Sequence, residues 1–166
     1  MKLKITLFLL AFSFACFAQD SEVKPGLPSV VVKNIEGEDV NIQSYASDGK
    51  ITIVSFFATW CKPCFKEFKN YNDLLDSWGE EYNAELVGVS TDDSRNMSKV
   101  RPIVNGMGWD FDILLDPNGD IQRAMNVVNP PVTFLLDKEG KIVYTHTGYV
   151  EGDEYALEDE IKKLVE

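Results

Sequence analysis

Residues 51–64 read ITIVSFFATWCKPC, and this stretch decides the fold. Its first half, residues 51–57, is short, β-branched and almost continuously apolar, which predicts a strand buried on both faces. After Pro63 the apolar residues recur at spacings of four, three, four and three, which predicts an amphipathic helix ending at Gly79. These apolar positions are Cys64, Phe68, Tyr71, Leu75 and Trp78. Two cysteines therefore lie where a buried strand passes into a helix.

The rest of the chain predicts an alternation of strands and helices. Short apolar or alternating runs predict strands at residues 30–32, 39–42, 85–90, 111–115, 132–136 and 141–146. A hairpin turn is expected at residues 137–140, and residues 116–120 read as a turn. Helices are expected from about residue 94 to 105 and around Leu157, Ile161, Leu164 and Val165. This order predicts an α/β fold whose central mixed sheet is flanked by helices on both faces.

The chain has 166 residues, 45% of them hydrophobic, and a net charge of −11. The first eighteen residues hold Lys2 and Lys4 and no acid. The remainder therefore has 14 basic against 27 acidic residues, a net charge of −13. A surface this acidic repels nucleic acid and anionic lipid, so neither is an expected partner.

The N-terminus has the pattern of a secretory signal peptide. A lysine-bearing start leads into an apolar run from Ile5 to Phe14, and polar sequence begins after Ala18. We expect cleavage after Ala18, which predicts a signal peptide at 1–18, a linker at 19–29 and one domain at 30–166. Two alternatives stay open, a lipoprotein modified at Cys16 and an uncleaved anchor. The expected location is extracytoplasmic or periplasmic.

The spacing of Cys61 and Cys64 suits thiol–disulfide exchange. Cys61 at the start of a helix faces free backbone N–H groups that favour its thiolate, the species that attacks disulfides. We expect Cys61 to be exposed, and Cys64, one turn later, to resolve the mixed disulfide. Pro63 fits the first helical turn, where a missing N–H costs nothing. A structural disulfide is the alternative. A metal site is not expected, because the chain offers one further cysteine and a single histidine.

Two segments resemble the TlpA/ResA-type branch of the thioredoxin-like superfamily. They are residues 57–64, with the pattern Trp-Cys-x-Pro-Cys, and residues 129–137, which read NPPVTFLLD. The resemblance runs from about residue 30 to the C-terminus and implies a thioredoxin-like fold. It also implies a cis proline at Pro131, beside the cysteines, with Pro130 at an edge where a substrate strand pairs. Pro130 departs from the common pattern because it lacks an N–H.

The resemblance also assigns roles to residues around the cysteines. Glu67 lies one turn after Cys64 and, as in the resembled branch, is expected to exchange a proton with Cys64 or tune its pKa. In cytoplasmic thioredoxins this task belongs to an Asp at the position of Ser55. A solvated helix carboxylate is the alternative for Glu67. Lys62 is a candidate stabiliser of the Cys61 thiolate, and Trp60 a candidate apolar platform.

The function expected from these residues is an exported enzyme that reduces protein disulfides, with no cofactor beyond the Cys61–Cys64 couple. By resemblance, a membrane thiol reductase supplies the electrons and apocytochrome c is a possible substrate; we expect a monomer. Two alternatives are a peroxiredoxin-like peroxidase and a non-catalytic binding module. Such peroxidases usually carry a proline and a Thr or Ser shortly before the reactive cysteine. Here Thr59 is present but the proline is absent, which disfavours the peroxidase.

Overall fold

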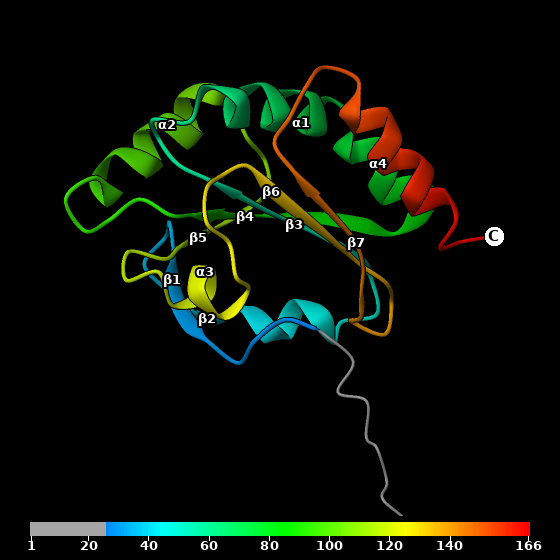
Figure 1. The fold of residues 1–166 in the computed structure, drawn as a ribbon, viewed down its shortest axis with the longest axis horizontal. Helices are drawn as coiled ribbons and strands as arrows, with labels where there is room; N and C mark the ends of the chain where they lie inside the picture. The colour runs from blue at the N-terminus through cyan, green and yellow to red at the C-terminus, as the bar shows by residue number, and fades with distance from the viewer. Residues whose placement is uncertain (1–25) are drawn as a thin grey trace, which may run out of the picture.

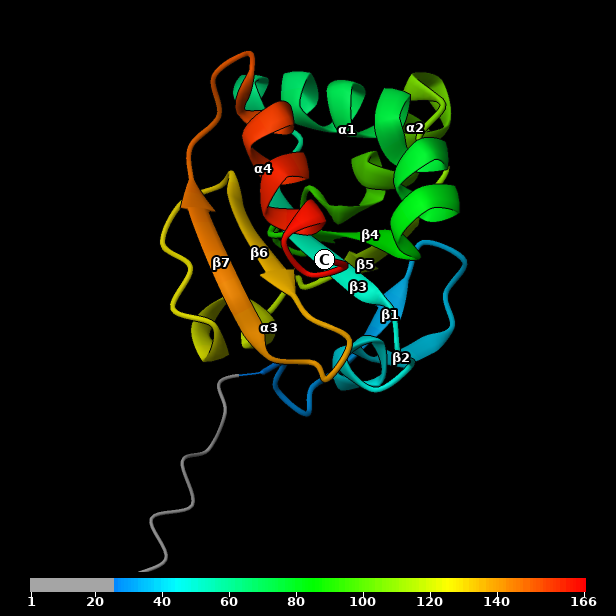
Figure 2. The same cartoon turned by 90° about the vertical axis from the view of Figure 1, so that its right-hand side faces the viewer.

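A computed structural model describes residues 26–166 as a central sheet with helices on both faces (Figures 1 and 2). The predicted signal peptide and most of the predicted linker lie outside the described residues. Leu27, assigned to that linker, is buried in the core, so packed structure begins before residue 30. Within residues 26–166, no helix combines the length and apolarity that a membrane span requires.

The sheet has seven strands in the order β2-β1-β5-β4-β3-β6-β7. Strands β3, β4 and β5 are parallel to one another, whereas β6 pairs antiparallel with β3 and β7, and β1 pairs antiparallel with β2 and β5. The strands are β1 (Val31–Asn34), β2 (Asp39–Asn41), β3 (Ile51–Phe57), β4 (Ala84–Ser90), β5 (Asp112–Leu115), β6 (Val132–Leu136) and β7 (Ile142–Thr147). This mixed sheet is the architecture that the sequence predicts.

Helices cover both faces of the sheet. Figure 1 shows α1 (Lys62–Tyr82), α2 (Val100–Met107) and α4 (Asp153–Lys162) on one face, and α3 (Asp120–Ala124) with the 3₁₀ helix η1 (Ile42–Ala46) on the other. A second 3₁₀ helix, η2 (Met97–Lys99), precedes α2. The two faces correspond to two hydrophobic clusters, one containing Phe68 of α1 and the other Ile121 of α3.

Strand β3 lies at the centre and is buried at every position. Successive side chains of a strand point to opposite faces. Ile53 and Phe57 therefore join the cluster under α1, whereas Val54 and Phe56 join the cluster on the other face. Ser55 has the same parity as Ile53, so the one serine of the strand faces the helix that carries Cys64.

Several element boundaries differ from the sequence prediction. Helix α1 continues through Gly79 to Tyr82, because it ends only where Asn83 takes a left-handed conformation with φ of 56°. Ile42 begins a 3₁₀ helix instead of ending a strand, since the Asn41 side chain accepts the N–H of Gln43. The helix predicted at 94–105 is η2 followed by α2, which ends at left-handed Gly108.

The turn predicted at residues 116–120 is confirmed, but it leads into a helix that the sequence analysis missed. Asp116 accepts the backbone N–H groups of Asp120 and Gln122 at 2.7 and 2.8 Å. These bonds satisfy donors at the start of α3, which is only five residues long.

Gly140, in the turn between β6 and β7, lies against Ala46 of η1 and offers a test of that contact. A Cβ there would overlap the carbonyl oxygen of Ala46, and φ is 75°; at Gly37 φ is 92° but nothing lies within 4 Å. Left-handed backbone costs an alanine about 1–2 kcal/mol at either site. We expect Gly140→Ala to lower the free energy of unfolding by about 1–3 kcal/mol more than Gly37→Ala does, measured by urea unfolding. Equal losses would contradict the overlap.

Candidate active site

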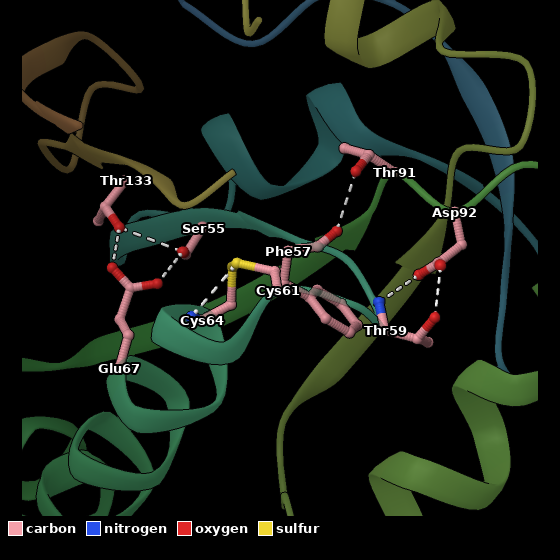
Figure 3. Close-up of a disulfide and its surroundings, with 9 residues drawn as sticks. All are labelled: Ser55, Phe57, Thr59, Cys61, Cys64, Glu67, Thr91, Asp92 and Thr133. Atoms are coloured by element: carbon pink, nitrogen blue, oxygen red, sulfur yellow. Dashed lines mark hydrogen bonds between the residues drawn. A yellow bond between two sulfur atoms is a disulfide. The ribbon is translucent and has the colours of Figure 1, made fainter. Parts of the chain in front are cut away.

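The cysteine pair lies where β3 gives way to α1, as predicted, and forms a disulfide (Figure 3). Cys61 is the N-cap of α1, and its N–H donates to the Ala58 carbonyl at 3.0 Å. The backbone N–H of Cys64 points at the Cys61 sulfur at 3.4 Å. Pro63 lies in the first turn, where it displaces no helical hydrogen bond. Cys61 therefore has a donor in place that favours its thiolate after reduction.

The expectation of an exposed Cys61 is wrong for this disulfide form. Cys61 is 3% exposed and Cys64 is fully buried, because both pack into the cluster that holds Phe57 and Phe68. The exposed members of the motif are Trp60, at 64%, together with Lys62 and Pro63. An incoming sulfur can reach Cys61 only through the small part of the residue at the surface.

The loop before β6 contains the two adjacent prolines. The Pro130–Pro131 peptide bond is cis, as the resemblance implied. Val132 pairs with Phe56, so Pro131 lies beside the end of β3 from which the cysteine loop leaves. Pro131 is buried and its carbonyl accepts the N–H of Gly148 at 2.9 Å, while Pro130 is half-buried. The structure thus brings the two predicted segments to one end of the sheet.

Glu67 is fully buried, which excludes the solvated-carboxylate alternative. Its two carboxylate oxygens accept hydrogen bonds from Ser55 of β3 and Thr133 of β6, each at 2.8 Å (Figure 3). Burial raises the pKa of Glu67 from 4.5 to about 7, although the hydroxyl donors oppose this rise. Ser55 was predicted from the sequence to lie near Glu67, whereas Thr133, the residue two positions after the cis proline, was not.

A second buried carboxylate, which sequence analysis missed, holds the loop before Cys61. Asp92 is 2% exposed and follows the end of β4. Its carboxylate accepts the Thr59 N–H at 2.8 Å and the Thr59 hydroxyl at 2.6 Å (Figure 3). It also accepts the Ser90 hydroxyl at 2.9 Å. Thr91, the residue before Asp92, donates its N–H to the Phe57 carbonyl at 2.8 Å. The cysteine loop is thereby tied to the neighbouring strand at two points.

Known proteins match the chain over most of its length. The AhpC/TSA family matches residues 23–145, and these include the cysteine pair, Glu67 and the prolines. The chain belongs to the AhpC/TSA family. The chain is 32% identical to sporulation thiol-disulfide oxidoreductase A of Bacillus subtilis, over 79% of this chain and 78% of that protein. It is 29% identical to thiol-disulfide oxidoreductase ResA of Bacillus thuringiensis, over 86% of this chain and 79% of that protein.

A solved structure has the same fold. A thioredoxin-like protein from Porphyromonas gingivalis is 47% identical and superimposes with a TM-score of 0.75, over 84% of this chain and 91% of that one. With the Cys61–Cys64 disulfide at the helix start, these relatives establish a thiol–disulfide oxidoreductase of thioredoxin-like fold. The fold and the enzyme class predicted from the sequence are confirmed.

The raised pKa of Glu67 predicts a pH-dependent stability. Between pH 4.5 and about 7 the folded protein keeps a proton that the unfolded chain has released, so stability falls as pH rises through this window. Glu67→Gln removes that titration. As pH rises from about 5 to about 8, we expect the free energy of unfolding of wild type to fall by up to about 3 kcal/mol relative to that of Glu67→Gln. The measurement is urea unfolding of the disulfide form. A constant difference across this range would contradict the raised pKa.

Asp92 is expected to position the cysteine loop. Asp92→Ala leaves the Thr59 N–H without its partner, so we expect kcat/KM for insulin reduction to fall about tenfold or more. The pH midpoint of Cys61 alkylation should rise, because Cys61 is held less firmly at the helix start. Asp92→Asn can keep all three contacts and should restore both values. A loss of thermal stability with an unchanged alkylation profile would reduce Asp92 to a structural role.

Proposed function

We propose that the protein is exported and reduces disulfide bonds in other proteins, with Cys61 as the attacking residue. The single observation that carries the direction of transfer is the buried Glu67 carboxylate one helical turn from Cys64. Once ionised, the Glu67 carboxylate disfavours a thiolate nearby. The dithiol form then loses the stabilisation that a thiolate would give it, and the equilibrium moves toward the disulfide. A couple that prefers its oxidised form gives electrons to substrates.

In the proposed reaction, the Cys61 thiolate attacks one sulfur of a substrate disulfide. The substrate S–S bond breaks, a Cys61–substrate bond forms, and the first substrate sulfur leaves as a thiolate. Cys64 then loses its proton to Glu67 and attacks the Cys61 sulfur. This forms the Cys61–Cys64 bond and releases the second substrate sulfur. Two electrons pass to the substrate, and a dithiol reductant must reduce Cys61–Cys64 again.

The surroundings of the pair supply the supporting roles. Lys62 is proposed to stabilise the Cys61 thiolate, and exposed Trp60 to pack against the substrate. The backbone beside cis Pro131 is proposed to receive an extended substrate segment, with Pro130 contributing no N–H. No cofactor beyond the cysteine couple takes part in this scheme.

Export and partners complete the proposal. The signal-peptide pattern of residues 1–18 supports secretion with cleavage after Ala18. A membrane-bound thiol reductase is the proposed electron donor, and apocytochrome c is a candidate substrate. The protein is proposed to act as a monomer. A peroxidase is the weaker candidate, because the Thr59 hydroxyl is already bound to Asp92.

Replacement of each cysteine tests the order of the steps. Cys61→Ser should abolish insulin reduction, because the attacking sulfur is gone. Cys64→Ala should instead accumulate mixed disulfides through Cys61, visible on non-reducing gels and released by dithiothreitol. Expressed in cells, these trapped complexes should be extracytoplasmic, and the recovered protein should begin at Gln19 by N-terminal sequencing.

Other outcomes would favour the alternatives. A lipidated N-terminus at Cys16, or an intact Met1, would replace cleavage after Ala18. Full insulin reduction by Cys61→Ser/Cys64→Ser would overturn the function itself. Rapid peroxide consumption by the reduced protein would favour the peroxidase, and a Cys61–Cys64 bond that dithiothreitol cannot reduce would favour a non-catalytic module.

A further inference from the structure

Helix α1 carries its charges in the order that the helix dipole disfavours. Its N-terminal half has three exposed lysines, Lys62, Lys66 and Lys69, and no acid in the first turn. Its C-terminal part has four acids and no base in the last turn; the acids are Asp73, Asp76, Glu80 and Glu81. The dipole stabilises acids at the start of a helix and bases at its end. Helix stability therefore does not explain these lysines.

The three lysines lie on one face of α1, at spacings of four and three, and they line a groove beside the cysteine pair. One part of the groove holds about 410 Å³ between Lys62, Pro63 and Lys66 of α1 and residues 149–151. The next part holds about 200 Å³ and adds Lys69 and Asn70. Both parts share Lys66, Tyr149 and Glu151. The groove thus leads away from the Cys61–Cys64 turn along the helix.

The charges of this groove are available to a partner. Within residues 26–166, Lys62 and Lys66 form no ion pair, and Lys69 contacts only Asp73 at 3.7 Å, with both side chains about two-thirds exposed. An exposed pair of this kind contributes little energy. Glu151 is the one acid among the lining residues, so the lining carries three positive charges and one negative. Val150, 69% exposed, adds an apolar contact.

We propose that this groove binds an acidic segment of the substrate protein, next to the disulfide that Cys61 attacks; the inference rests on the proposed reductase function. A chain of net charge −11 repels acidic partners over most of its surface. A local cluster of lysines at the reactive edge makes that edge the favourable approach. Charge complementarity of this kind raises association rates and fixes orientation.

Two peptides with the same disulfide loop, one flanked by glutamates and one by lysines, test the proposal. Each kcat/KM is divided by the rate with bis(2-hydroxyethyl) disulfide, which is uncharged, so that changes in thiol chemistry cancel. At 0.1 M salt the screening length is about 10 Å, and the groove charges outweigh distant ones. We expect wild type to prefer the acidic peptide about tenfold, and 0.5 M NaCl to remove most of this preference.

Lys66→Glu/Lys69→Glu should invert the preference, because it reverses two of the three groove lysines. The matched control is Lys138→Glu/Lys141→Glu, which changes the net charge equally at the β6–β7 turn. That turn adjoins Leu136, which pairs with Thr52 at the end of β3 remote from the cysteines. We expect the control to keep the wild-type preference.

Three results would overturn the docking site. The first is equal normalised rates for the two peptides with wild type. The second is equal effects of the two double variants on the preference. The third is a loss of rate in Lys66→Glu/Lys69→Glu that is as large for the uncharged disulfide as for the acidic peptide. The last would assign the lysines to thiolate chemistry. Failure of wild type to reduce any of the three disulfides would instead overturn the proposed function itself.

Discussion

Complete burial of strand β3 is the constraint on which the other features depend. All seven of its residues lie out of solvent, so the sheet must be covered on both faces and the strand must have a neighbour on each edge. Helix α1 follows directly and covers one of those faces. The cysteine pair lies where the strand gives way to the helix, because Cys61 occupies the N-cap position at which the helical hydrogen bonding of α1 begins.

The same burial creates opposed influences on the two sulfurs. The helix start and the Cys64 N–H favour a thiolate at Cys61. The Glu67 carboxylate, enclosed between α1, β3 and β6, disfavours negative charge nearby when it is ionised. Because its pKa is about 7, the balance between these influences changes near neutral pH. One helix thus carries both the N–H that donates to the Cys61 sulfur and the carboxylate that is proposed to restrain the thiolates.

Parallel strands bring the supporting residues to the same place. The cysteine loop follows β3 and Asp92 follows β4, and these strands run parallel, so both lie at the carboxyl edge of the sheet. Antiparallel β6 begins at that edge and therefore contributes Pro131 and Thr133 from its start. A single edge collects groups from three strands, while the surface beside it is shaped by α1 and the loop after β7.

The sequence by itself determined the buried strand at 51–57, the helix after it and the reactive pair between them, because local period and helix-end chemistry act over a few residues. The cis bond before Pro131 followed from the resemblance of residues 129–137. Tertiary structure alone decided whether Glu67 is buried, since a spacing of three on a helix suits a solvated or an enclosed carboxylate equally. Its partner Thr133 is 66 residues away, and Asp92 is 33 residues from Thr59. Such contacts, and the burial of Cys61, depend on which elements pack together, which no local pattern records.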